Sequence, residues 1–551
     1  MPRMFGTDGV RGLANVDITA DLALRLGEAA ARQFGCRPRP DGSKPRAIIG
    51  RDTRISGQFL DHALAAGLAS AGMDVTRIGV VTTPTVAHLT ATEDGVDLGV
   101  MISASHNPMP DNGIKFFAHG GHKLADAVED QIEALVGTDW ERPTGEGVGE
   151  IDADHAWARE SYIRHLVGAV GTDLRGLRVV IDCANGGASE FGPAVFRELG
   201  ADATVINASP DGRNINLNAG STHPEALMAA VVEAGADFGV AYDGDADRCL
   251  AVDHTGALVD GDKIMGALAV DAHRRGALAK DTLVVTVMSN LGLLLAMREA
   301  GIATVQTGVG DRYVLEEMLA SGYSLGGEQS GHIIATDHAT TGDGILSSLL
   351  VSRMVKESGR SLADLTSFVH RLPQTLINVA GVDRAGALVH IDACIGVCHM
   401  LGLRALHLES PLSWTRTVRG ATRARRGPPR LKLPRIPGPP RPQRRERSRA
   451  GTSPPRRTRV WAPDNGRRSR RYIGRGGDAG CAAIHGQRRH VGGPLPDQRV
   501  ADLLDAPRGR DQLFLDVGVD SVEARPLDLG TVDADMDLGS TRVLEHADDL
   551  L

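Results

Sequence analysis

The stretch Asp237-Phe-Gly-Val-Ala-Tyr-Asp-Gly-Asp-Ala-Asp-Arg248 decides the fold of this 551-residue chain, because an apolar run ends there in a charged, glycine-containing loop. Such a run predicts a buried strand over 237–242, and the loop predicts where that strand ends. Apolar runs of the same kind recur up to about residue 380, and they predict further strands at Ala47–Gly50, Leu98–Ile102, Arg178–Ile181, Leu283–Val287 and Ser324–Gly326.

Segments with helical spacing lie between several of these strands, so the chain alternates strands and helices as α/β domains do. The predicted helices include Thr19–Phe34, Phe59–Ala71 and Pro224–Ala234. Polar or glycine-containing segments at 137–150, 256–262 and 371–374 predict the boundaries between units. The resulting organisation is three α/β domains over 1–150, 151–258 and 259–372, followed by an atypical region over 373–551.

The acidic loop carries Asp243, Asp245 and Asp247 at alternate positions. Three carboxylates this close repel one another unless a cation offsets their charge, and oxygen ligands suit Mg²⁺. The loop has neither the glycine nor the distal glutamate of an EF-hand, so calcium sensing is disfavoured. Arg248 follows directly and can bind a phosphate through two parallel hydrogen bonds. A solvated acidic turn is the plainer alternative.

Two more polar loops have residue types suited to a phosphosugar. Ser103-Ala-Ser-His-Asn-Pro108 begins where the run Leu98–Ile102 ends, so a serine hydroxyl is exposed on a turn where it can hold a phosphoryl group. In Gly326-Gly-Glu-Gln-Ser-Gly-His332, Glu328 and Ser330 can bind vicinal sugar hydroxyls, and His332 can act as a general base. Taken alone, either loop also fits an ordinary turn.

A fourth candidate loop is Phe5-Gly-Thr-Asp-Gly-Val-Arg-Gly12, where Arg11 lies on a glycine-bounded turn and can face a phosphate. Thr307-Gly-Val-Gly-Asp-Arg-Tyr313 is a fifth, and either one fits a plain turn as well. The combination of a serine loop, a three-carboxylate loop, a sugar-hydroxyl loop and several arginines indicates phosphoryl transfer on a sugar. Catalysis of that reaction depends mainly on positioning and on neutralising charge.

Composition excludes several other classes of protein. With 42% hydrophobic and 24% charged residues the chain can build ordinary cores, while 3% aromatic residues are too few for broad stacking platforms for single-stranded nucleic acid. No apolar run approaches the roughly 18 residues of a membrane span, and the N-terminus has no signal-peptide pattern. The six cysteines fit reduced, buried thiols, so we expect a cytoplasmic protein.

The segment 416–475 differs from the rest of the chain. It contains 21 Lys or Arg residues against two acids, a net charge of +19 that leaves −27 for the remainder. Three interpretations are open: a tail for nucleic acid or an acidic partner, a disordered solvated segment, or a C-terminus out of frame with an ancestral coding sequence. The third is favoured, because a shifted frame in GC-rich DNA enriches Arg, Pro, Gly and Ala. Nucleic-acid binding is the least favoured. His390, Cys394, Cys398 and His399 also suggest a zinc site, but no second thiolate pair completes it.

The order of these loops up to about residue 380 resembles the α-D-phosphohexomutases. Ala246 in the acidic loop and Gln329 in the sugar loop resemble the members that act on glucosamine phosphates, with phosphomannose and phosphoglucose enzymes as the alternative. The resemblance implies mixed-sheet α/β domains around a central cleft, a small phosphosugar substrate and one Mg²⁺. It implies neither a membrane nor a nucleic-acid partner, and it leaves the oligomeric state open.

The resemblance also implies roles for individual residues. Ser105 would be a phosphoserine that, with Asp243, Asp245 and Asp247, holds the Mg²⁺. Its phosphoryl group would pass to glucosamine 6-phosphate, giving a bound glucosamine 1,6-bisphosphate that reorients and returns the other phosphoryl group. The implied catalytic residues are Ser105, His106, Lys115, Arg248 and His332, and the implied substrate-binding residues are Arg11, Glu328 and Ser330.

The C-terminal region departs from the family. Members carry a fourth domain with an Arg-Pro-Ser-Gly-Thr-Glu-Pro type of loop that grips the phosphate not being transferred. No such segment follows Gln374 in this sequence, and the match fades after Leu372-Pro-Gln-Thr-Leu-Ile-Asn-Val379. We therefore expect a largely disordered region in place of the fourth domain, and weaker turnover, because that loop supplies positioning.

Overall fold

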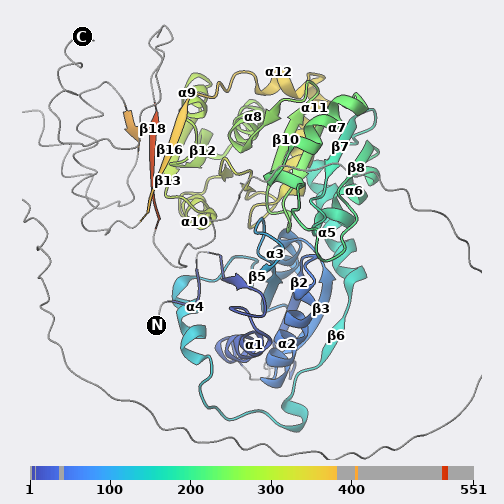
Figure 1. Ribbon diagram of the computed structural model, residues 1–551, viewed down its shortest axis with the longest axis vertical. Helices are drawn as coiled ribbons and strands as arrows, with labels where there is room; N and C mark the ends of the chain where they lie inside the picture. The colour runs from blue at the N-terminus through green and yellow to red at the C-terminus, as the bar shows by residue number, and fades with distance from the viewer. Residues whose placement is uncertain (1–2, 7, 36–41, 381–403, 407–511, 519–551) are drawn as a thin grey trace, which may run out of the picture. The chain divides into compact units, whose positions relative to one another are not determined.

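The computed structural model describes residues 3–6, 8–35, 42–380, 404–406 and 512–518 (Figure 1). These residues form four β-sheets, three of which are mixed and carry helices. The expected class, three consecutive α/β domains with mixed sheets, is confirmed. The domains are called I, II and III here after these three sheets. Among the described residues, no helix has the length and apolarity needed to cross a bilayer.

Domain I is built on a six-stranded sheet in the order β1-β5-β4-β2-β3-β6. Its strands are β1 (Val10–Leu13), β2 (Arg46–Arg51), β3 (Asp74–Val80), β4 (Leu98–Ile102), β5 (Asp111–Ala118) and β6 (Ile151–Ala153). Its helices are α1 (Ala20–Phe34), α2 (Ser56–Ser70), α3 (Thr83–Thr92) and α4 (Asp126–Leu135). The strands β4, β2, β3 and β6 run parallel, whereas β5 is antiparallel to both of its neighbours.

Both faces of this sheet are covered, and the alternation of side chains along β2 shows why. Ile49 belongs to the apolar cluster that includes Leu26 of α1 and Leu64 of α2. The adjacent Ile48 belongs to a second cluster with Val86 of α3. Successive side chains of a strand point to opposite faces, and each such residue contributes roughly 1.5–3 kcal/mol on full burial. The sheet is therefore fixed in register by helices on both sides.

Domain II is a five-stranded sheet in the order β11-β10-β9-β7-β8. Its strands are β7 (Arg178–Asp182), β8 (Asp202–Ile206), β9 (Phe238–Tyr242), β10 (Cys249–Asp253) and β11 (Leu258–Val259). Its helices are α5 (His155–Val170), α6 (Ala188–Glu198) and α7 (Glu225–Ala234). The strand β9 is buried at every position and ends where the acidic loop begins.

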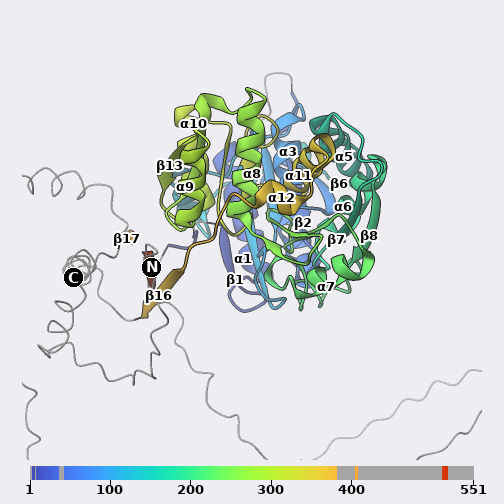
Figure 2. The same cartoon turned by 90° about the horizontal axis from the view of Figure 1, so that it is seen from above.

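Domain III is a four-stranded sheet in the order β13-β12-β14-β15. Its strands are β12 (Thr282–Thr286), β13 (Ala303–Thr307), β14 (Leu325–Gly327) and β15 (Ile333–Ala335). Its helices are α8 (Gly261–Arg274), α9 (Leu291–Glu299), α10 (Asp311–Ser321), α11 (Gly344–Ser358) and α12 (Leu362–Thr366). Figure 2 shows α8 and α12 side by side, and α11 contacts α8, α5 and β10, which joins domains II and III.

The first expected boundary, at residue 150, falls just before β6, and β6 pairs with β3 in the sheet of domain I. After α12 the chain enters β16 (Gln374–Ala380), which pairs antiparallel with β18 (Gln512–Gly518), and β18 pairs with β17 (Arg404–Leu406). The rest of the region 373–551 lies outside the described residues, and it includes the arginine-rich segment and the suggested zinc ligands. The expectation of disorder there therefore stays a prediction.

Candidate active site

The three carboxylates of the acidic loop converge where β9 ends. Asp243, Asp245 and Asp247 are buried, and one carboxylate oxygen from each lies within 4.8 Å of the other two. Ala246 adopts a left-handed φ of 56°, which turns the loop tightly enough to bring them together. Burial first, and then the charges of Asp247 and Asp245, raise the pKa of Asp243. The atom Asp245 Oδ1 is buried without a hydrogen-bond partner among the described residues, so this donor set fits a hard cation such as Mg²⁺.

Ser105 reaches this carboxylate group from domain I. Its loop leaves the carboxyl end of β4, and Ser105 itself has a left-handed φ of 50°. The hydroxyl donates to Asp243 Oδ2 at 2.5 Å, and its Oγ lies 3.5 Å from Asp247 Oδ1. Carboxyl ends of parallel strands are the usual place for ligands in α/β sheets. The serine and the acidic loop, separated by 138 residues, thus form one site.

His106 lies beside the serine, with its Nδ1 atom 3.4 Å from Ser105 Oγ. Burial, followed by the positive charges of Arg248 and Arg11, lowers the pKa of His106 to about 4. The imidazole is therefore neutral near pH 7 and can accept a hydrogen bond.

Arg54, which sequence reasoning missed, holds the serine loop in place. Its side chain is fully buried and its guanidinium donates to Asp52 Oδ2 at 2.9 Å. It also donates to three carbonyl oxygens of the loop, those of Ser105, Asn107 and Pro108. The only local signal is a pair of opposite charges, Asp52 and Arg54, directly after the apolar run of β2. The partners lie more than 50 residues away, so the sequence alone does not reveal them.

Lys115 and Thr83 of domain I hold the acidic loop of domain II. The ammonium group of Lys115 is buried and donates to Asp245 Oδ2 at 2.9 Å, while Asp247 Oδ2 lies 3.7 Å away. Burial alone would lower the pKa of Lys115, but Asp245, Asp8 and Asp247 raise it, so the lysine is cationic. Thr83 donates its hydroxyl to Asp245 Oδ2 at 2.6 Å and its N–H to the Asp245 carbonyl. The role of Thr83 has no sequence signal, because it depends on docking between domains.

The sugar loop lies between β14 and β15 of domain III. Glu328 Oε1 accepts the N–H of Gly310 at 2.9 Å, and the Ser330 hydroxyl donates to Glu328 Oε2 at 3.3 Å. Gly331 has a φ of +91°, and a Cβ atom there would lie 2.3 Å from the carbonyl oxygen of Cys249. Only glycine therefore allows this loop to pass against β10. The contact places the sugar loop next to the residues that follow the acidic loop.

His332 and Arg248 connect the sugar loop to the carboxylates. The Nδ1 atom of His332 lies 3.8 Å from Asp247 Oδ2, and its Nε2 atom accepts the N–H of Gly342 at 3.1 Å. Burial would lower the pKa of His332, but Asp247 and then Asp311 raise it. The Nε atom of Arg248 lies 3.8 Å from Asp247 Oδ1 and is buried without a hydrogen-bond partner among the described residues.

Arg11 lies on β1 and contacts the carboxylate of Asp8. Its Nε atom is also buried and unpaired among the described residues, so a guanidinium donor is available on this side of the serine. The structure thus brings Ser105 together with His106 and the acidic loop, while Lys115 of β5 and His332 of the sugar loop also contact that loop. Arg248 lies 3.8 Å from Asp247, and the contacts of Arg11, Glu328 and Ser330 are with Asp8, with Gly310 and with each other rather than with Ser105. Their catalytic and binding roles remain proposals.

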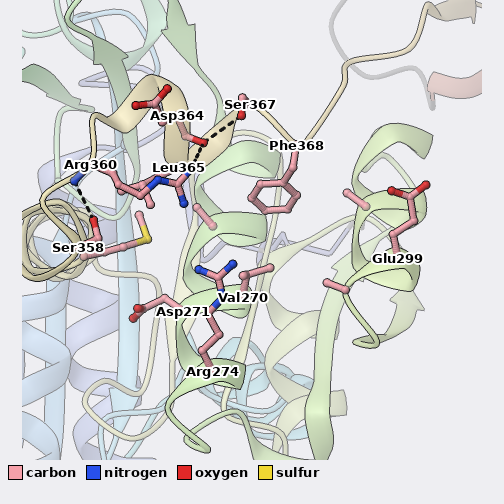
Figure 3. A pocket seen from close by; sticks show the side chains of 14 residues that line it. Val270, Asp271, Arg274, Glu299, Ser358, Arg360, Asp364, Leu365, Ser367 and Phe368 are labelled. Carbon is pink, nitrogen blue, oxygen red and sulfur yellow. Dashed lines mark hydrogen bonds between the residues drawn. The ribbon is translucent and has the colours of Figure 1, made fainter.

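A separate cavity of about 360 Å³ lies in domain III (Figure 3). It is lined by residues of α8, α9, α11 and α12, and its lining includes the apolar Val270 and Phe368 and the charged Arg274 and Glu299. None of the residues of the serine, acidic or sugar loops lines it. The chemistry of the candidate active site is therefore located elsewhere, at the meeting point of the three domains.

Comparison with known families agrees with this fold and these loops. The models of the phosphoglucomutase/phosphomannomutase α/β/α domains I, II and III match residues 2–142, 160–256 and 260–372. The chain belongs to the phosphoglucomutase/phosphomannomutase family, and the resemblance read from its loops is confirmed. The family matches end at residue 372, and the C-terminal part is unmatched.

The curated relatives are phosphoglucosamine mutases, which are isomerases. The enzyme of Bifidobacterium animalis subsp. lactis is 60% identical over 392 residues, or 70% of this chain and 86% of the relative. That of Streptomyces coelicolor is 58% identical over 390 residues with the same coverage. Among solved structures, a phosphoglucomutase/phosphomannomutase family protein from Burkholderia thailandensis is 25% identical with a TM-score of 0.60, covering 69% of this chain and 81% of that one.

Proposed function

We propose that this chain is a phosphoglucosamine mutase that interconverts glucosamine 6-phosphate and glucosamine 1-phosphate. The observation that carries the proposal is the contact between Ser105 Oγ and the buried carboxylates of the acidic loop, at 2.5 Å from Asp243. A serine hydroxyl beside a cation-binding group can carry a phosphoryl group whose charge the cation neutralises. The identity to curated phosphoglucosamine mutases supports the choice of substrate.

In the proposed reaction Ser105 carries the phosphoryl group. The bond between phosphorus and Ser105 Oγ breaks as a bond forms to the O1 atom of glucosamine 6-phosphate, and the proton of that hydroxyl passes to His332. Lys115, cationic and buried beside Asp245, faces the transferred group and balances its charge. The product is a bound glucosamine 1,6-bisphosphate. After it reorients, its 6-phosphoryl group returns to Ser105 by the reverse transfer, which releases glucosamine 1-phosphate.

The remaining residues bind and orient the substrate. The Glu328 carboxylate accepts a hydrogen bond from one sugar hydroxyl, and the neighbouring Ser330 hydroxyl donates one to the adjacent sugar hydroxyl. Arg11 and Arg248 supply unpaired guanidinium N–H groups to the phosphates. His106 is neutral and accepts a hydrogen bond near the serine. Asp243, Asp245 and Asp247 with the serine oxygen would hold one Mg²⁺, which when bound would supply Lewis-acid stabilisation of the phosphoryl oxygens. Because phosphosugars are charged and do not cross bilayers, we propose a cytoplasmic location.

We further propose that turnover is impaired in this chain. The sequence contains no Arg-Pro-Ser-Gly-Thr-Glu-Pro type of loop after Gln374, so nothing recognisable grips the phosphate that is not being transferred. Misplacement of a reacting group by about 1 Å can cost about 100-fold in rate, so loss of a whole phosphate contact lowers kcat as well as affinity. Phosphorylation of Ser105, which needs only the three described domains, is retained.

A coupled assay for glucosamine 1-phosphate tests this function. The reaction contains glucosamine 6-phosphate, Mg²⁺ and a catalytic amount of glucosamine 1,6-bisphosphate, with Ser105→Ala as the control. Activity that disappears in the control supports the mutase, and a kcat/KM equal to that of a complete relative would overturn the impairment. Faster turnover of mannose or glucose 6-phosphate would assign the alternative substrates. Incorporation of phosphate at Ser105 without turnover would indicate a remnant that lacks its phosphate grip.

A further inference from the structure

Lys123 joins domain I to domain III beside the candidate active site. It lies between β5 and α4, its side chain is 14% exposed, and its ammonium group contacts two carboxylates. One belongs to Asp8 of domain I, and the other is Asp311 Oδ2 at the start of α10 in domain III, at 2.5 Å. Burial would lower the pKa of Lys123, but Asp311 and Asp8 raise it well above its usual range. The lysine is therefore a fixed positive charge in the interface.

The two carboxylates lead from Lys123 to residues of the site. Asp8 also contacts the guanidinium of Arg11. Asp311 Oδ2 lies 3.6 Å from His332 Nε2, on the side of the ring away from Asp247. Charges therefore alternate from Arg11 through Asp8, Lys123 and Asp311 to His332, with one end in domain I and the other in domain III. No local pattern reveals this series, because Lys123 is 115 residues from Asp8 and 188 from Asp311.

Removal of the lysine would change this interface in a defined way. Asp8 and Asp311 would be left on opposite sides of it, and like charges at short range in a partly buried place repel strongly. A cavity of about 130 Å³ borders Lys123, Asp311 and His332, so a methionine at position 123 fits without overpacking. The expected response is separation of the two carboxylates, which carries Arg11 and His332 apart.

We infer that Lys123 is a positioning residue that sets the distance between Arg11 and His332 across the interface of domains I and III. The inference rests on the proposed function in one respect, that these two residues face the phosphosugar. Asp311 shares the role, because it is the partner through which the lysine acts on domain III. The hydrogen bonds and ion pairs of Lys123 and Asp311 in the described structure do not include Ser105 or the acidic loop, so their effect is on geometry rather than on bond making.

Steady-state kinetics of Lys123→Met, Lys123→Arg, Asp311→Asn and the double variant K123M/D311N test the inference. We expect K123M to lower kcat by about 100-fold with a smaller change in KM, since misplacement affects the transition state most. K123R keeps the charge and should restore much of the rate. The double variant should lose little more than K123M, because contacting residues are not additive. The matched control is Lys44→Met, a lysine of domain I that lies 3.9 Å from Asp74 of the same domain.

Hydrogen exchange provides a second readout that needs no turnover. In K123M, amides at 9–13 and at 328–344 should exchange faster than in the wild-type chain, while K44M leaves both segments unchanged. Fully additive effects of K123M and D311N, or an unchanged kcat in K123M, overturn the inference. If the wild-type chain has no mutase activity the proposed function fails, and the exchange experiment alone then decides: no increase in K123M overturns the coupling, and an increase in both segments supports it.

Discussion

The replacement of Arg54 by methionine is the sharpest test of how the serine loop is held. In Arg54→Met, each of the three carbonyl oxygens that Arg54 binds would keep another hydrogen-bond donor. Asn216 Nδ2 donates to the carbonyls of Ser105 and Asn107, and the N–H of Asp111 donates to that of Pro108. The cost of Arg54→Met therefore comes mainly from Asp52, whose fully buried carboxylate loses its cationic partner.

The magnitude follows from that unpaired charge. Breaking a buried ion pair by removing one partner costs about 3–5 kcal/mol. Burial already raises the pKa of Asp52 even with Arg54 present, so protonation will relieve part of the penalty. We expect the lower end, about 3 kcal/mol near pH 7, and a smaller loss at lower pH because protonated Asp52 carries no charge. The double variant Asp52→Asn/Arg54→Met should recover much of the stability, because it removes both charges.

Hydrogen exchange of β4, β5 and the serine loop is the appropriate assay, because it reports on domain I alone. A loss of about 3 kcal/mol corresponds to about a 100-fold increase in exchange rate, since 1.4 kcal/mol is a factor of ten. Phosphate incorporation at Ser105 should fall in the same variant. A change in exchange below about twofold, or a double variant no more stable than R54M, would refute the reasoning.

Three further predictions concern the acidic loop and the junction of domains II and III. Mg²⁺ at 100 times its Kd should stabilise the chain by about 2.7 kcal/mol in calorimetry, and Asp247→Asn should reduce that gain. Burial raises the pKa of Asp343 to about 6 from an ordinary 3.8, so the folded state binds the proton more tightly. Stability should therefore fall by about 2 kcal/mol as pH rises from 4 to 6, and Asp343→Asn should flatten this slope. Tyr162→Phe removes a 2.7 Å hydrogen bond to the Asp343 carboxylate and should lower the free energy of unfolding by about 1.5–3 kcal/mol. Tyr242→Phe removes a hydrogen bond to the neutral Ser348 hydroxyl and should lower it by about 1 kcal/mol. Thermal unfolding of both variants measures the difference.

Each of these has a contrary result. Equal stabilisation of wild type and D247N by Mg²⁺ would place the cation elsewhere. A pH slope unchanged in D343N would assign the proton uptake to another buried acid, such as Asp262, whose pKa burial also raises to about 6. Equal losses for the two tyrosine variants would show that the charge on the acceptor is unimportant.

The sequence predicted the strands and loops that follow local rules. The acidic loop starts directly after β9, and the serine loop directly after β4, because an apolar run and a glycine or proline turn define both ends. The strand β12 spans Thr282–Thr286, one residue earlier at each end than the expected Leu283–Val287. Its ends are set by pairing with β13 and β14 rather than by its own apolar run. The short β6 is exposed at all three positions, so it has no apolar pattern to predict it.

The parts of the site that the sequence did not reveal depend on contacts between distant segments. Arg54, Thr83 and Lys123 have ordinary local surroundings, and their partners lie in other loops or other domains. Polar and charged residues are usually exposed to solvent, and only the assembled structure shows that these three are largely buried. After residue 380 the sequence has no clear periodicity, so no strand could be predicted there. The described residues of that region are the strands β17 and β18.

The contacts that Lys115 and Thr83 make with Asp245 have a consequence for the order of events during biosynthesis. Domain I leaves the ribosome before domain II, and domains generally fold as units from the N-terminus onward. The acidic loop has to stay hydrated until Lys115 is available, because three unpaired carboxylates cannot be desolvated cheaply. Domain I therefore acts as a template on which the acidic loop closes. A mutation that slows the folding of domain I would leave newly made domain II exposed to proteases, although its own sequence is unchanged.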